Sequence, residues 1–234
     1  MNKRMKPIQT KQNNLMQKPK LFWSLTAGIL TAVFVVFTLI VKFVDVKYDG
    51  IAEIGCGVIN FWWRDFIGIN STWNLISNIV AVIILILVGI VCIWQVVIIT
   101  RSKSLRNLPK HWWFFNLTLV GLLTCYLLFQ IVVINYRPIL VANATEVSYP
   151  SSHVLMIATV CPLLISVFNQ EIKSKVWRNS FTVMGVVLLV LGIIARVLSG
   201  YHWFTDLIGG ILLSMVLVSW YQMLLARYKL PSSL

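Results

Sequence analysis

The segment FTVMGVVLLVLGIIARVLSGYHWFTDLIGGILLSMVLVSW, residues 181–220, contains two long apolar runs separated by a short polar stretch. Each run approaches the ~20 residues that a helix needs to cross the hydrocarbon core of a bilayer. The boundary between them holds Arg196, His202 and Asp206, which are costly inside a membrane unless they are paired or functional. The segment therefore predicts two consecutive spanning helices joined by a polar turn at one membrane face.

The rest of the chain extends this pattern. The sequence is 59% hydrophobic and 12% charged, which is typical of a multi-span membrane protein and not of a soluble domain. We expect an all-α fold with a single six-helix membrane domain over residues 21–226, a basic tail at 1–20 and a short tail at 227–234. The expected spans are residues 21–44, 74–99, 112–135, 152–169, 181–198 and 204–226.

The basic residues indicate an orientation. Most of the 20 Lys and Arg residues lie in the N-terminal stretch, in the loops after the second and fourth spans, and at the C-terminus. The positive-inside rule therefore predicts that both termini are cytoplasmic in a plasma membrane protein. We interpret the net charge of +13 as topology information. We expect no nucleic acid partner, since the basic residues are spread among loops without an accompanying aromatic pattern.

The stretch GCGVINFWWRDFIGINSTW, residues 55–73, lies between the first two spans and is rich in aromatic side chains. Its composition predicts a short helix lying in the outer membrane interface. Two interpretations of this helix remain open. It can be an aromatic anchor, or it can form a wall that guides a lipid substrate to an external site.

Two Arg and two His residues from four different spans fall at the same outer face: Arg137, His153, Arg196 and His202. Taken singly, each Arg can be a side chain that reaches the interface, and the pair of His202 with Asp206 can be structural. Together they suit a phosphoryl group, because guanidinium groups bind phosphate oxygens in a bidentate manner. Asp206 follows His202 by one helical turn, so its carboxylate can fix the tautomer of the imidazole.

The stretch YPSSHV, residues 149–154, opens the fourth span at this same face. A helix that begins here directs its free N–H groups and positive dipole end toward an anion. One His can then attack phosphorus while the other donates a proton. The Arg side chains supply positive charge, so we expect neither a metal nor a cofactor.

These segments resemble the three-part signature of the type 2 phosphatidic acid phosphatase superfamily, Lys-x6-Arg-Pro, Pro-Ser-x-His and Ser-Arg-x5-His-x3-Asp. The corresponding segments here are QIVVINYRP, ending in Arg137-Pro138, then PSSH at 150–153, then ARVLSGYHWFTD at 195–206. The resemblance covers about residues 130–210. Within the superfamily, the chain looks similar to bacterial phosphatidylglycerophosphatase B and undecaprenyl diphosphate phosphatase-like enzymes.

The resemblance implies a role for each matched residue. His202 would be the nucleophile that forms a phosphohistidine, Asp206 would orient it, and His153 would protonate the leaving group. The phosphoryl oxygens would be bound by a set of cationic and hydroxyl side chains: Arg137, Arg196, Ser151 and Ser152.

Two positions depart from the signature. The Lys of the first part is replaced by Gln130, and the Ser before Arg196 is replaced by Ala195. On a helix that continues to Arg137, Gln130 would lie on nearly the same face, and its amide could donate a hydrogen bond as an auxiliary group. A hydrogen bond to a charged group is worth about 1.5–3 kcal/mol. We therefore expect a slower enzyme and not an inactive one.

The sequence thus predicts an integral membrane phosphatase, independent of metal, that hydrolyses a lipid phosphate or diphosphate at the extracytoplasmic face. Phosphatidic acid, phosphatidylglycerophosphate and undecaprenyl diphosphate are the candidate substrates, and undecaprenyl diphosphate in a bacterial plasma membrane is the leading one. Two alternatives remain open, namely a lipid phosphotransferase that uses the same site and a catalytically impaired homologue that binds lipid phosphates. The oligomeric state does not follow from the sequence.

Overall fold

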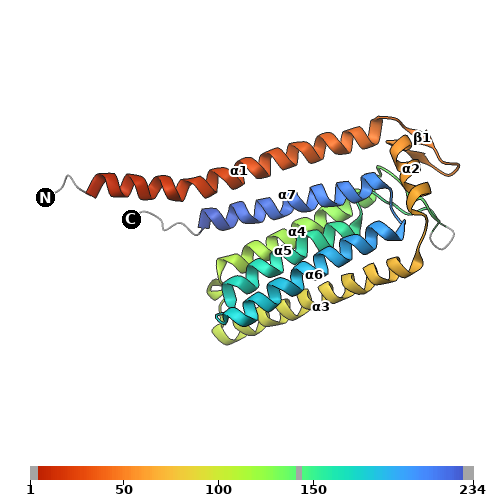
Figure 1. Ribbon diagram of the computed structural model, residues 1–234. Coiled ribbons are helices and arrows are strands. Elements are labelled where there is room, and N and C mark those ends of the chain that lie inside the picture. Colours follow the sequence, from red (N-terminus) through yellow and green to blue (C-terminus); the bar gives the residue numbers. More distant parts are fainter. Residues whose placement is uncertain (1–4, 141–143, 229–234) are drawn as a thin grey trace.

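The computed structural model describes residues 5–140 and 144–228, with side chains described from residue 18 onward. The described residues form seven α-helices, a two-stranded hairpin and a single 3-10 turn (Figure 1). The helices are α1 (Met5–Phe43), α2 (Gly57–Ile67), α3 (Ser71–Ser102), α4 (Lys110–Ile131), α5 (Ser152–Glu171), α6 (Lys175–Ser199) and α7 (Phe204–Tyr228). The other elements are β1 (Lys47–Tyr48), which pairs antiparallel with β2 (Glu53–Ile54), and η1 (Leu105–Asn107).

Six of these helices are long and apolar enough to cross a membrane, namely α1 from Lys18 onward and α3 to α7. The predicted all-α, six-span architecture is therefore confirmed, and the chain is a multi-pass membrane protein. The small hairpin between α1 and α2 was not predicted. Residues 5–20 of the predicted basic tail continue α1, whereas residues 1–4 and 229–234 of the two tails lie outside the described residues.

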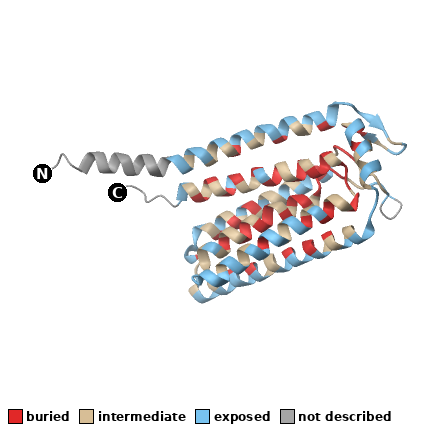
Figure 2. Ribbon diagram, viewed as in Figure 1, coloured by how far each residue is buried: buried red, intermediate tan, exposed pale blue. Residues whose placement is uncertain are grey.

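The helices form a bundle in which α5 and α7 are the most buried. Figure 2 shows buried residues concentrated on these two helices, while the outer helices carry many exposed positions. Helix α7 packs against α1, α4 and α5, and α6 packs against both α3 and α5. Large apolar side chains such as Phe22, Ile86 and Val187 are exposed on the outer helices. This exposure fits a protein whose surrounding solvent is lipid.

One end of the bundle is closed by α2 and the hairpin, opposite the end at which α1 begins and α7 ends (Figure 1). At this closed end α6 stops at Gly200, which adopts a left-handed conformation with φ of 70°. A Cβ atom at Gly200 would lie 1.7 Å from the carbonyl oxygen of Gly68. The connection from α2 to α3 therefore packs directly on the turn between α6 and α7, and only glycine fits that contact.

The predicted third span is wrong at its C-terminal end. We expected helix as far as Asn135, but α4 ends at Ile131. The following segment instead pairs antiparallel with residues 146–148, where the Arg137 N–H donates to the Glu146 carbonyl at 2.9 Å. This pairing satisfies backbone groups that a longer helix would otherwise satisfy, so the chain leaves the helix early.

The short helix predicted between the first two spans is present as α2. It lies beyond the membrane-spanning helices and contacts α7 and β1. Its location in the membrane interface stays a prediction.

Candidate active site

His202 lies in the turn between α6 and α7, and its side chain is almost fully buried. Its ring nitrogens face different partners. Nε2 lies 2.7 Å from Nη2 of Arg196, and Nδ1 lies 3.0 Å from the Ser148 hydroxyl oxygen. Because a guanidinium group can only donate, Nε2 must accept, and the ring proton is therefore on Nδ1. This tautomer leaves a lone pair on Nε2, directed at the guanidinium.

Asp206, in the first turn of α7, is fully buried. Its Oδ2 atom accepts hydrogen bonds from the Ser148 hydroxyl and, at 3.0 Å, from the Trp203 backbone N–H. The same oxygen lies 3.6 Å from Nδ1 of His202, which is too long for a direct hydrogen bond. The expected partnership of His202 with Asp206 is thus indirect, and Ser148 lies between them.

Arg196 is buried near the end of α6, with 1% of its surface exposed. Besides its contact with His202, it donates from Nη1 to Oδ1 of Asn74 at 2.6 Å. Asn74 belongs to the first turn of α3, so the guanidinium is held between α3 and the turn that carries His202. Its Nε atom is buried and has no protein acceptor.

Arg137 follows α4 in the strand-like segment that pairs with residues 146–148. Its Nη2 atom lies 3.3 Å from a carboxylate oxygen of Glu146, and its Nε atom is buried without a protein acceptor. The backbone pairing therefore holds Arg137 at the site. Its Nε–H group remains available to bind an anion.

The start of α5 contributes Ser151, Ser152 and His153. Ser151 precedes the helix, is fully buried, and its N–H donates to the Asp206 carbonyl at 3.0 Å. This contact joins the start of α5 to the start of α7. The hydroxyl of Ser151 and Nδ1 of His153 are buried and have no hydrogen-bond partner.

Several buried polar atoms at this site have no partner among the described residues. Those able to donate are Nε of Arg137, Nε of Arg196, the hydroxyl of Ser151 and, when protonated, Nδ1 of His153. Buried polar groups in folded proteins are nearly always hydrogen-bonded. A set of four unpartnered donors from three segments of the chain, two of them cationic, suits an anion with several oxygen acceptors.

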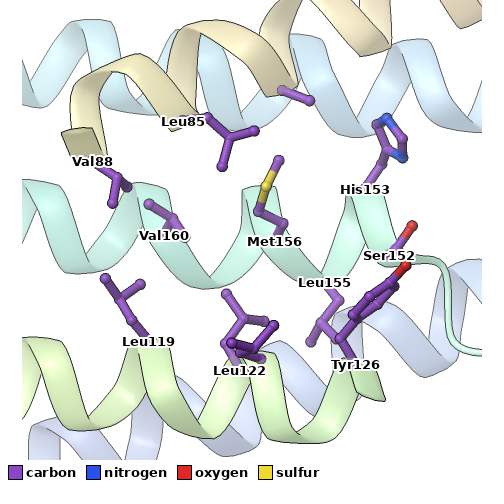
Figure 3. A pocket seen from close by; sticks show the side chains of 12 residues that line it. Leu85, Val88, Leu119, Leu122, Tyr126, Ser152, His153, Leu155, Met156 and Val160 are labelled. Atoms are coloured by element: carbon purple, nitrogen blue, oxygen red, sulfur yellow. The ribbon is translucent and has the colours of Figure 1, made fainter. Parts of the chain in front are cut away.

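An apolar groove leads away from His153. It lies between α3, α4 and α5 and has a volume of about 360 Å³. Figure 3 shows Leu85, Met156 and Leu122 along it, with Ser152 and His153 at one end. A groove with these walls suits a hydrocarbon chain whose polar end lies beside His153.

The electrostatics of the site favour a neutral His202. Burial lowers its pKa well below the ordinary value of about 6.5, and the nearby cations Arg196 and Arg137 lower it further. At neutral pH the ring is therefore uncharged, and the lone pair on Nε2 can react once the guanidinium of Arg196 transfers its hydrogen bond to an oxygen of the substrate.

Gln130 does not lie where we expected. It is exposed in the last turn of α4, and Arg137 lies beyond the end of that helix. The predicted shared helical face is therefore wrong. Ala195, at the second position that departs from the signature, is fully buried. Among the described residues, no group of three or more His, Cys, Asp or Glu side chains is placed to bind a metal ion.

The family model described as the PAP2 superfamily matches residues 109–229, more than half of the chain. The chain belongs to the PAP2 superfamily. The match includes every residue that we predicted for the site. Helices α1 to α3 lie outside it.

A comparison with curated protein sequences gives no match for this PAP2 protein. Among solved structures, it is similar to the crystal structure of the first transmembrane PAP2-type phosphatidylglycerolphosphate phosphatase from Bacillus subtilis. The TM-score is 0.47 and the sequence identity 21%, over 92% of this chain and 97% of that chain.

Sequence reasoning on this PAP2 protein missed three polar contacts of the site, made by Asn74, Glu146 and Ser148. Asn74 marked the start of a predicted span at the same face as the predicted site residues, and that position was a usable signal. Ser148 precedes the Pro-Ser-Ser-His segment by two residues, and no spacing rule pointed to it. Its partners, His202 and Asp206, lie more than 50 residues away in the sequence.

Proposed function

We propose that this protein is a lipid phosphatase that hydrolyses a lipid phosphate or diphosphate through a phosphohistidine intermediate on His202. Membership of the PAP2 superfamily supports phosphatase activity on a lipid. The observation that carries the proposal is the unprotonated Nε2 of His202, held 2.7 Å from Arg196 beside buried donors that have no partner.

In the first step, the Nε2 lone pair attacks phosphorus. The new P–N bond forms as the P–O bond to the leaving group breaks, and His153 gives a proton to the departing oxygen. The negative charge of the bound substrate favours the protonated form of His153. Arg137 and Arg196 stabilise the charge on the phosphoryl oxygens in the transition state.

In the second step, water attacks the phosphohistidine. His153, now neutral, accepts a proton from the water, and the P–N bond breaks to release inorganic phosphate and regenerate neutral His202. The same group thus acts as acid and then as base, which is the usual pattern for covalent catalysis in two steps.

The groove between α3, α4 and α5 supports a lipid as the substrate. An apolar chain lying in the groove would be beside His153, and the phosphate attached to it would reach the buried donors of the site. Phosphatidic acid, phosphatidylglycerophosphate and undecaprenyl diphosphate each combine a phosphate group with such a chain. Undecaprenyl diphosphate remains our leading candidate.

We place the site at the extracytoplasmic face of a plasma membrane, with both termini cytoplasmic. The support is the distribution of charge. The loops and the adjoining helix ends at the end of the bundle far from α2 carry a cluster of basic residues: Arg101, Lys103, Arg106, Lys173, Lys175 and Arg178. Segments of this composition stay on the cytoplasmic side, and His202 lies at the opposite end of α6.

The test is phosphate release by the purified protein in detergent micelles, measured over the three candidate lipids with and without EDTA. We expect release from at least one of them, unchanged by EDTA, and a loss of at least about a thousandfold in His202→Ala. Rapid quenching in alkaline detergent, in which a P–N bond survives, should trap a labelled phosphoenzyme in the wild type and none in this variant. His111→Gln is the matched control, since His111 is bonded to Glu171 at the far end of the bundle.

Unchanged phosphate release in His202→Ala would disprove the mechanism. Transfer of the phosphate to a second lipid with a free hydroxyl group, in place of release as inorganic phosphate, would identify a phosphotransferase. Binding of the lipids without release would identify the impaired homologue.

A further inference from the structure

Ser148 lies between His202, the proposed nucleophile, and Asp206. It is 1% exposed and belongs to neither α5 nor α7. Its hydroxyl oxygen lies 3.0 Å from Nδ1 of His202, and its hydroxyl group also bonds to Oδ2 of Asp206. Among the described side chains, it is the one hydrogen-bonded to both of these residues.

The directions of these two hydrogen bonds follow from the donors available. Arg196 can only donate to Nε2, so the proton of the neutral His202 ring is on Nδ1 and is donated to Ser148. Ser148 has one hydroxyl proton, and the carboxylate of Asp206 is an acceptor. The hydroxyl therefore accepts from His202 and donates to Asp206, in a continuous chain of two hydrogen bonds.

Backbone contacts fix this hydroxyl. The N–H of Ser148 donates to the Asn135 carbonyl at 2.9 Å, in the pairing that also holds Arg137. On the other side, Asp206 is fixed by the Trp203 N–H. The middle member of the chain, Ser148, and its acceptor end, Asp206, are thus held by the backbone, so the imidazole at the donor end has little freedom to turn.

We propose that Ser148 is a positioning residue that couples Asp206 to His202 and fixes the orientation of the imidazole ring by accepting from its Nδ1–H. This inference rests on the proposed function. When Nε2 bonds to phosphorus, the imidazole ring becomes positively charged and Nδ1–H becomes a stronger donor. Ser148 relays the stabilising effect of the Asp206 carboxylate without any proton leaving Nδ1.

The kinetic test compares Ser148→Ala with Ser214→Ala. Ser214 is a buried serine of α7 whose hydroxyl donates to the Ile211 carbonyl, away from the site. We expect Ser148→Ala to lower kcat about 10- to 100-fold with KM changed less than about threefold, and Ser214→Ala to leave both nearly unchanged. Ser148→Cys keeps a weak donor and acceptor and should recover part of the rate.

A double-mutant cycle separates coupling from a general structural effect. If Ser148 acts through Asp206, then Ser148→Ala should cost little more when Asp206→Asn is already present. Independent, multiplicative losses in the double variant would overturn the proposal. So would a Ser148→Ala enzyme with the kcat of the wild type.

A direct readout does not depend on activity. The chain has three His residues, so ring-nitrogen NMR of the full-length protein labelled with 15N-histidine can report each tautomer. The His202 signals are identified by their loss in His202→Ala. We expect the Nδ1–H form in both proteins, because Arg196 still donates to Nε2, and an Nδ1–H signal that is shifted and exchanges faster with water in Ser148→Ala. If no lipid phosphate is hydrolysed but this difference is seen, the proposed function fails and the role of Ser148 stands. An unchanged Nδ1–H signal in Ser148→Ala would disprove that role, whatever the activity.

Discussion

At the scale of single residues, the site contains two cations, and the two have different partners. Arg196 is fixed by the side-chain oxygen of Asn74 and by Nε2 of His202. Neither contact neutralises the guanidinium, so its charge stays available for a phosphoryl group. Arg137 differs, because Glu146 offsets part of its charge at the more exposed side of the site.

The charge of Arg196 leads to a prediction about pH. It contributes to the lowered pKa of His202, so kcat/KM of the wild type should fall only at a pH well below about 6.5. Replacing the cation in Arg196→Gln raises the pKa of His202 and should move this acid limb to higher pH, in addition to lowering the rate. The measurement is the pH profile of kcat/KM with one lipid substrate. The ionisation of the lipid substrate is the same for both proteins. An acid limb at the same pH in Arg196→Gln and in the wild type would therefore contradict the assignment of this limb to His202.

At the scale of elements, the short helix α2 is attached to the start of α7. Asn60 of α2 is fully buried. Its amide nitrogen donates to the Thr205 hydroxyl at 2.9 Å and to the Gly55 carbonyl at 2.8 Å, and its oxygen accepts from the Thr205 N–H at 3.2 Å. A helix that served only as an aromatic anchor would not need these contacts. They indicate that α2 also supports the turn that carries His202.

We therefore predict that Asn60→Ala impairs both stability and activity. The substitution leaves the Thr205 N–H buried without an acceptor, at a cost of about 1–3 kcal/mol. Thermal unfolding in detergent should show a lower transition temperature, and kcat should fall because the turn between α6 and α7 loosens. Asn60→Asp keeps the acceptor but sets a buried carboxylate oxygen against the Gly55 carbonyl, so it should lower the transition temperature at least as much. A transition temperature of Asn60→Ala equal to that of the wild type would contradict this account.

At the scale of the whole molecule, the bundle brings an apolar groove to a cationic site. The groove runs between α3, α4 and α5, while the cations come from α6 and from the segment after α4. No single helix contains both features. The packing of α5 in the centre of the bundle joins them, because its first turn carries His153 and its following turns line the groove (Figure 3).

This arrangement predicts how chain length affects the reaction. Met156→Trp fills part of the groove and should raise KM for long-chain lipid phosphates by about tenfold, which corresponds to ~1.4 kcal/mol of lost binding. A short-chain or water-soluble phosphate ester should be nearly unaffected. Met215→Trp, at an exposed position of α7, is the matched control. An equal rise in KM for short and long chains would show that the groove does not hold the lipid.

The sequence by itself determined the six spans, because each one is a local run of apolar residues whose length matches the bilayer. It also predicted that five residues lie at one face of the membrane, because the ends of the spans and the charges of the loops indicate the side of each residue. These residues are Arg137, His153, Arg196, His202 and Asp206. The end of α4 was decided instead by the antiparallel pairing of residues 135–137 with 146–148. Because α4 ends before Arg137, Gln130 and Arg137 do not share a helical face as expected.

Only the tertiary structure placed Ser148 between His202 and Asp206, and Asn74 against Arg196. These contacts join segments that are 54 to 122 residues apart in the chain. Hydropathy and motif spacing report on neighbours along the sequence, whereas a buried hydrogen bond depends on which helices pack together and on how their ends are turned. For that reason the sequence could predict which groups react, and the packing of the bundle decided how those groups are held.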